Sequence, residues 1–217
     1  MSETTKDALY TWASVLALIT IFYNVAEGLI SVFLGLEDET YALLGFGLDS
    51  FVEVISGIGI WHMIKRLRLN STSPPDRFEQ QALRVTGSAF YLLACGLILV
   101  SCINVYHGHK PETTFWGIII ALVSIITMGV LIYYKVTVGR RLNSTAILAD
   151  ANCTKACLYL SVILLIASAG YELTGLGGID TAGAVMIAVF SFREGREAFQ
   201  KAQGKPTCGC SGGCHEL

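Results

Sequence analysis

Two pairs of side chains with metal-ligand chemistry stand four residues apart in apolar surroundings. One pair is Asp49 and Glu53, and the other is Cys153 and Cys157. Residues i and i+4 lie on one face of an α-helix, one turn apart. A carboxylate at the centre of a membrane span opposes insertion by roughly 2.5–3.5 kcal/mol, so two of them on one helix indicate a function. The spacing predicts that both pairs converge into one four-ligand site for a divalent metal ion.

Three further polar residues lie near these pairs. Asn24 and Glu27 are three positions apart in an apolar segment and share a helix face. Asp150 lies within an arc of about 60° that includes both cysteines. We treat Asp150, Glu27 and Asn24 as candidate accessory or proton-path residues. Interhelical hydrogen bonding is the alternative for Asn24 and Glu27, and the sequence leaves that choice open.

A second cluster of metal-ligand side chains lies close to the C-terminus. It consists of three cysteines and a histidine: Cys208, Cys210, Cys214 and His215. Thiolates and imidazoles are ligands that Zn²⁺ and softer ions prefer. We expect a metal-binding tail in the cytoplasm, where disulfides are rare.

The composition indicates an integral membrane protein. Of the 217 residues, 53% are hydrophobic and 15% are charged, whereas soluble domains carry about 25% charged residues. The N-terminus lacks the features of a cleavable signal peptide, so we expect the first apolar segment to stay in the membrane. The lipid bilayer is the expected environment, and no nucleic-acid partner is expected.

Six windows reach the length of about 20 apolar residues that a membrane span needs. They are 13–34, 42–64, 85–105, 115–134, 146–170 and 179–199. Basic residues gather on one side of this arrangement, with only Lys110 on the other. They are Lys65, Arg66, Arg68, Arg77, Arg84, Lys135, Arg140, Arg141, Arg193, Arg196, Lys201 and Lys205.

The positive-inside rule then places both termini in the cytoplasm. The predicted fold is an all-α membrane protein with six transmembrane helices and a short Cys-rich C-terminal tail. The predicted division is a cytoplasmic N-terminus (1–12), a six-helix transport domain (13–199) and a cytoplasmic metal-binding tail (200–217). We expect the protein in the plasma membrane or an inner membrane.

Three stretches resemble the cation diffusion facilitator family. They are residues 43–57 with the run Leu-Asp-Ser-Phe-Val-Glu-Val-Ile-Ser, residues 146–160 with Ala-Asp-Ala, and the Ile179-Asp180 start of the last window. The resemblance implies six helices, usually in a homodimer, that export divalent metal ions in exchange for protons. It also implies that Asp49 and Glu53 of the second helix and Cys153 and Cys157 of the fifth bind the ion.

The sequence departs from this family at two places. The fifth-helix pair is Cys/Cys, where the family typically has His or Asp. We also expect the Cys-rich tail to stand in place of the family's cytoplasmic C-terminal domain.

The expected function is transport, not catalysis. Two thiolates and two carboxylates suit Zn²⁺ or a softer ion such as Cd²⁺, whereas Mg²⁺ and Ca²⁺ prefer oxygen ligands. Bound metal must displace protons from these ligands, so alternating access couples metal efflux to proton entry. The alternatives are a membrane metal sensor or chaperone that hands ions on through the tail, and a membrane thiol oxidoreductase.

Overall fold

The computed structural model describes residues 3–69, 77–107, 110–111, 113–176 and 178–203. Each predicted span lies within one helix of this described part, so the all-α fold with six helices is confirmed. The helices are α1 (Glu3–Glu37), α2 (Tyr41–Leu69), α3 (Arg77–His107), α4 (Phe115–Leu142), α5 (Thr145–Thr174) and α6 (Gly178–Ala202).

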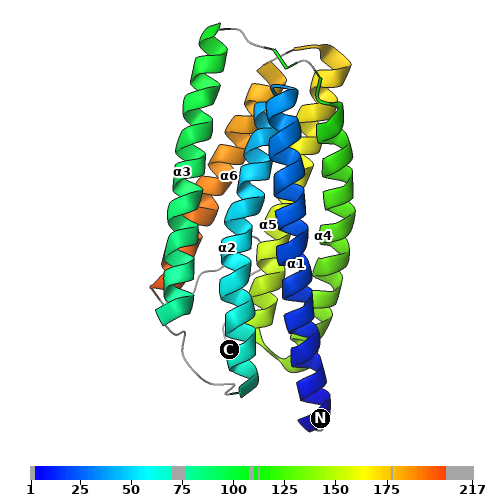
Figure 1. Cartoon of the computed structure of the whole chain (residues 1–217), viewed down its shortest axis with the longest axis vertical. Coiled ribbons are helices and arrows are strands. Elements are labelled where there is room, and N and C mark those ends of the chain that lie inside the picture. Colours follow the sequence, from blue (N-terminus) through cyan, green and yellow to red (C-terminus); the bar gives the residue numbers. More distant parts are fainter. Residues whose placement is uncertain (1–2, 70–76, 108–109, 112, 177, 204–217) are drawn as a thin grey trace, which may run out of the picture.

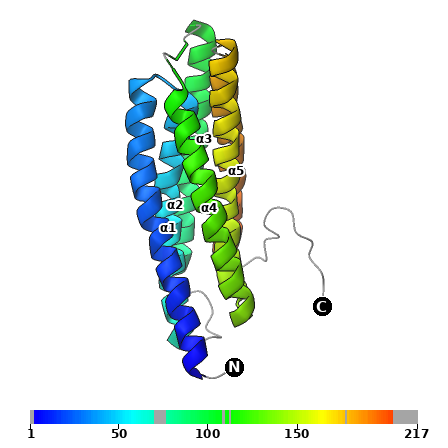
Figure 2. The same cartoon turned by 90° about the vertical axis from the view of Figure 1, so that its right-hand side faces the viewer.

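The helices run alternately up and down in one elongated bundle (Figures 1 and 2). Helix α1 packs on α2 and α4, α3 packs on α6, and α5 contacts α4, α6 and α2. We call the end at which α2, α4 and α6 finish the basic end. It is defined by the basic residues in their last turns, which are Arg66, Arg68, Arg140, Arg141 and Lys201.

Five of the helices in the described part of the chain, α1 to α5, are long and apolar enough to cross a membrane. The protein is therefore an integral membrane protein with several spanning helices. Helix α6 is less apolar because its second half carries charged side chains. These are Arg193, Glu194, Arg196, Glu197 and Lys201. Its crossing of the bilayer stays a prediction, which its packing along α3 and α2 supports.

The structure corrects the position of Lys135. The sequence pattern placed this residue among the basic residues between the fourth and fifth spans. It instead lies inside α4 and is 1% exposed. The pattern was misleading because α4 continues seven residues beyond Lys135, to Leu142, as one uninterrupted helix.

Two pairs of helices, α1 with α2 and α3 with α6, pack closely at glycine residues. A Cβ atom added to Gly47 of α2 would lie 2.8 Å from the backbone nitrogen of Val32 on α1. A Cβ atom added to Gly195 of α6 would lie 3.1 Å from the carbonyl oxygen of Gly87 on α3. Because glycine has no side chain, these helix backbones can come this close.

At the end opposite the basic end, carboxylates cap helix N-termini. Asp180 of α6 accepts hydrogen bonds from the backbone N–H groups of Tyr41 (2.9 Å) and Ala42 (3.3 Å) at the start of α2. Glu172 of α5 accepts one from the backbone N–H of Thr114, just before α4. A carboxylate at this position pairs orphan N–H groups and interacts favourably with the helix dipole. These contacts link α6 to α2 and α5 to α4.

Candidate metal centre

Three helices meet at one carboxylate oxygen of Glu53. Oε2 of this α2 residue accepts a hydrogen bond from Nδ2 of Asn24 on α1 at 3.2 Å. The same oxygen accepts a hydrogen bond from Sγ of Cys157 on α5. One residue from each predicted ligand pair is thus in direct contact, although the two residues are 104 positions apart in sequence.

The start of α5 helps to position its two cysteines. Ser144 is the N-cap, and its side chain accepts from the backbone N–H of Ile147. From this cap the helix runs without interruption through Cys153 and Cys157, which lie one turn apart. Both are free thiols, and Cys157 is buried.

Two adjoining pockets lie beside the Glu53–Cys157 contact. The smaller one, of about 40 Å³, is lined by Asn24, Glu53, Asp150, Cys153, Cys157 and Glu194, together with mainly small or apolar residues. The larger one, of about 230 Å³, shares Asp150, Cys153 and Glu194 with it and extends to Met63 and Lys201. Met63 and Lys201 lie near the C-terminal ends of α2 and α6, so the larger pocket is directed toward the basic end.

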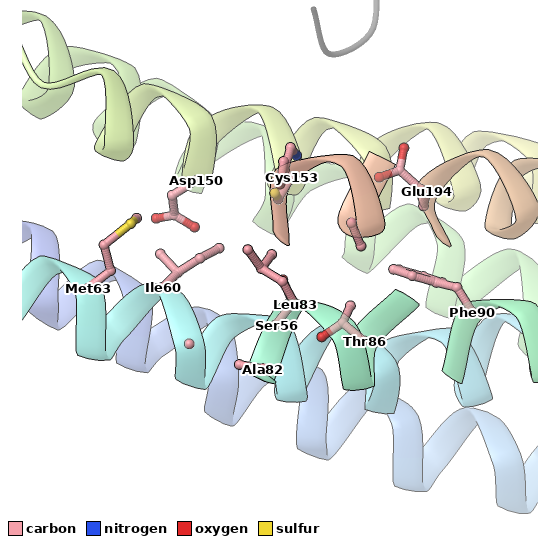
Figure 3. A pocket seen from close by; sticks show the side chains of 13 residues that line it. Ser56, Ile60, Met63, Ala82, Leu83, Thr86, Phe90, Asp150, Cys153 and Glu194 are labelled. Carbon is pink, nitrogen blue, oxygen red and sulfur yellow. The ribbon is translucent and has the colours of Figure 1, made fainter. Parts of the chain in front are cut away.

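Figure 3 shows how the larger pocket is built. Asp150, Cys153 and Glu194 lie along one side, on α5 and α6. The facing side is formed by α2 and α3 with mostly apolar side chains, which are Ser56, Ile60, Met63, Ala82, Leu83, Thr86 and Phe90. The chemically reactive side chains are therefore confined to one wall of the pocket.

Asp49 is placed differently from its predicted partners. It is 2% exposed, and its Oδ1 accepts a hydrogen bond from Oγ of Ser191 on α6 at 3.1 Å. It is not among the residues that line the two pockets. Across the described residues, no three His, Cys, Asp or Glu side chains gather closely enough to hold a metal ion. The four-ligand set of Asp49, Glu53, Cys153 and Cys157 therefore stays a prediction.

Asp150 forms a buried ion pair that the sequence analysis missed. Its Oδ1 lies 2.9 Å from Nζ of Lys135, and the same Nζ donates to Oγ1 of Thr154 at 2.9 Å. Thr154 in turn donates to the backbone carbonyl of Asp150. The three side chains connect α4 to the turn of α5 that carries Cys153.

Glu27 lies in a polar cluster between α1 and α2. Its Oε1 accepts from the Tyr23 hydroxyl at 2.9 Å, and its Oε2 accepts from Oγ of Ser50 at 3.2 Å. The side chain is 7% exposed. These contacts have the form of interhelical packing, and a place for Glu27 on a proton path stays a prediction.

Glu194 is a pocket residue that the sequence analysis did not single out. It lies in the charged second half of α6 and lines both pockets beside Cys153. The spacing of two polar residues could have indicated this position, because Ser191 and Glu194 are three positions apart and share one face of α6. Ser191 binds Asp49 from that face.

Lys155 bonds within its own helix, to Oδ1 of Asn152 at 3.1 Å. The predicted tail site lies outside the described residues. It comprises Cys208, Cys210, Cys214 and His215, and it stays a prediction.

Comparisons with known proteins agree with this architecture. Residues 17–202 match the cation efflux transmembrane domain. An uncharacterized transporter of Methanocaldococcus jannaschii is 25% identical to the chain over 157 residues. That alignment covers 69% of this chain and 54% of the relative, so the match spans about half the length of the curated relative.

Proposed function

The chain belongs to the cation efflux family, a family of membrane transporters and not of enzymes, and from that premise we propose that it exports Zn²⁺ or Cd²⁺ in exchange for protons. The observation that carries the proposal is the contact between Glu53 and Cys157 inside the bundle. Polar groups are unfavourable in a membrane interior, so a carboxylate and a thiol that meet there indicate a functional site.

The ligand chemistry supports the choice of ion. Glu53, Cys153 and Cys157 line one pocket, and these three side chains together offer one carboxylate and two sulfur atoms. Such a set suits tetrahedral Zn²⁺ and the softer Cd²⁺. Mg²⁺ and Ca²⁺ select oxygen ligands and would be poorly bound by the two sulfur atoms. We propose that Asp49 joins these three residues when the helices close around the ion.

Proton exchange follows from the chemistry of the proposed ligands. Cys157 and Glu53 are in contact, and a thiol and a carboxyl group can each carry a proton. A metal ion binds the deprotonated forms and must release protons on entry. When the metal leaves, protons return to the ligands. Opening to each side in turn therefore couples the two fluxes in opposite directions.

The asymmetry of the bundle supports efflux. The larger pocket is directed toward the basic end, which the positive-inside rule places in the cytoplasm. The opposite end is held together by the Asp180 and Glu172 caps and by a 2.6 Å hydrogen bond from Asn104 to Thr181. Cytoplasmic metal can enter this arrangement, and transport requires the capped end to open. We further expect a homodimer, as the family resemblance implies.

Transport into proteoliposomes tests the proposal. With protein reconstituted across a pH gradient, Zn²⁺ or Cd²⁺ should accumulate against the proton flux, Mg²⁺ should not, and a protonophore should abolish accumulation. Asp49→Ala should slow transport strongly, whereas Asp7→Ala at an exposed ion pair should not. Unchanged transport in Asp49→Ala would remove Asp49 from the ligand set, and metal flux that ignores the pH gradient would refute exchange.

The Cys-rich tail separates the transporter from the sensor or chaperone alternative. Replacing Cys208, Cys210 and Cys214 by serine should leave the maximal transport rate in proteoliposomes close to the wild-type value, because the bundle ligands are intact. A sensor or chaperone that passes ions on through its tail requires those thiols. Loss of metal movement in this triple variant would favour that alternative.

A further inference from the structure

The side-chain amide of Asn24 is buried, and only its nitrogen has a hydrogen-bond partner among the described residues. The side chain is 1% exposed, and its Nδ2 donates to Oε2 of Glu53. Its Oδ1 is shielded from solvent and accepts no hydrogen bond within the described part of the chain. Buried polar atoms are nearly always paired, so this oxygen calls for an explanation.

The unpaired oxygen belongs to a residue that lines the same pocket as Glu53, Cys153 and Cys157. Nδ2 and Cys157 converge on one oxygen of Glu53, so the Asn24 amide lies beside two of the predicted ligands. Asp49, by contrast, is bound to Ser191 and does not line the pocket. In this conformation the residue that lines the pocket with Glu53, Cys153 and Cys157 is Asn24, whereas the sequence pattern predicted Asp49 there.

We propose that Oδ1 of Asn24 is a direct ligand of the transported ion in the conformation open to the basic end, and that it shifts the site's preference toward Zn²⁺ over Cd²⁺. This inference rests on the proposed metal transport. Asn24, Glu53, Cys153 and Cys157 then supply two oxygen and two sulfur atoms, which suits four-coordinate Zn²⁺. Without the amide oxygen the sulfur atoms dominate, and soft ligands favour the softer ion.

Competitive binding of Zn²⁺ and Cd²⁺ to the purified protein measures this preference. In Asn24→Leu, Zn²⁺ affinity should fall by about tenfold or more, the low end of what lost metal-site partners cause. Cd²⁺ affinity should fall less, and the ultraviolet absorption of the Cd²⁺–thiolate bonds should persist. The ratio of the two affinities is the readout, because a general loss of structure would weaken both ions together.

Asn104 provides a matched control. It is also buried, at 3% exposure, its Nδ2 also donates to a side chain, and its Oδ1 is also unpaired among the described residues. It lies near the end of α3, and neither pocket includes it. Asn104→Leu should leave the ratio of Zn²⁺ to Cd²⁺ affinity unchanged.

Asn24→Asp distinguishes a ligand from a residue that only holds Glu53 in place. A carboxylate keeps an oxygen for the metal, so Zn²⁺ binding near neutral pH should be retained and should depend more steeply on pH. If Asn24 acts only through its N–H donor, this variant removes the donor and weakens both ions alike. That result, or an unchanged ratio in Asn24→Leu, refutes the role of Asn24 as a ligand and leaves the proposed transport function standing. Wild-type protein that binds neither ion overturns the proposed transport as well.

Discussion

Replacing Glu53 by glutamine is expected to abolish metal transport while leaving the bundle folded. Glutamine has the shape of glutamate and retains an oxygen that can accept from Asn24 and Cys157. It lacks the negative charge that a divalent ion requires of its ligand. Loss of an outer partner lowers metal affinity by about 10–100-fold, and loss of a direct ligand should lower it on the order of 100-fold or more. Isothermal titration with Zn²⁺ and proteoliposome flux measure the two effects.

The pH dependence gives this prediction a second, independent readout. Zn²⁺ binding to wild-type protein should weaken as pH falls, because protons compete for the ligands. Glu53→Gln cannot bind the exchanged proton on that side chain, so it should release fewer protons for each ion bound. Glu37→Gln, at an exposed position at the end of α1, is the matched control and should behave as wild type. Wild-type transport in Glu53→Gln would exclude this residue as a ligand.

The helices and one ligand contact were accessible from the sequence because they depend on local spacing. Apolar windows locate the six helices. The i, i+4 rule places Glu53 on the same face of α2 as Asp49, and Cys157 on the same face of α5 as Cys153. Their contact follows if both faces point to the bundle interior, and the structure shows that contact. The contacts of Asp49 with Ser191 and of Glu53 with Asn24 depend instead on how α6 and α1 are rotated against α2, and helix rotation is set by packing between helices.

Lys135 shows a different limit of sequence reasoning. A lysine near the end of an apolar window is normally assigned to the aqueous boundary, since a charge in the bilayer is unfavourable. Its buried partner Asp150 lies on the next helix, 15 positions later, and no pattern along one helix connects them. Glu194 was not singled out from the sequence because it stands among other charged residues, yet it lines the pocket.

Replacing Lys135 by methionine is expected to produce the largest loss of stability. The ammonium group is 1% exposed and donates to both Asp150 and Thr154. Removing one member of a buried ion pair leaves an uncompensated charge, which destabilises a protein by about 3–5 kcal/mol. Thermal unfolding of the purified protein in detergent should show this loss, with no metal present.

A second substitution should return much of that stability. In Lys135→Met/Asp150→Leu both charges are absent, and apolar replacement of a buried pair is often neutral or stabilising. Lys155→Met, where the lysine bonds Asn152 on the same helix, is the matched control and should change stability little. If the double variant is as unstable as Lys135→Met, the loss comes from the packing of the lysine chain and not from the unpaired carboxylate. A rescued double variant that still binds metal would assign the pair to holding α4 against α5, apart from the ion's own ligands.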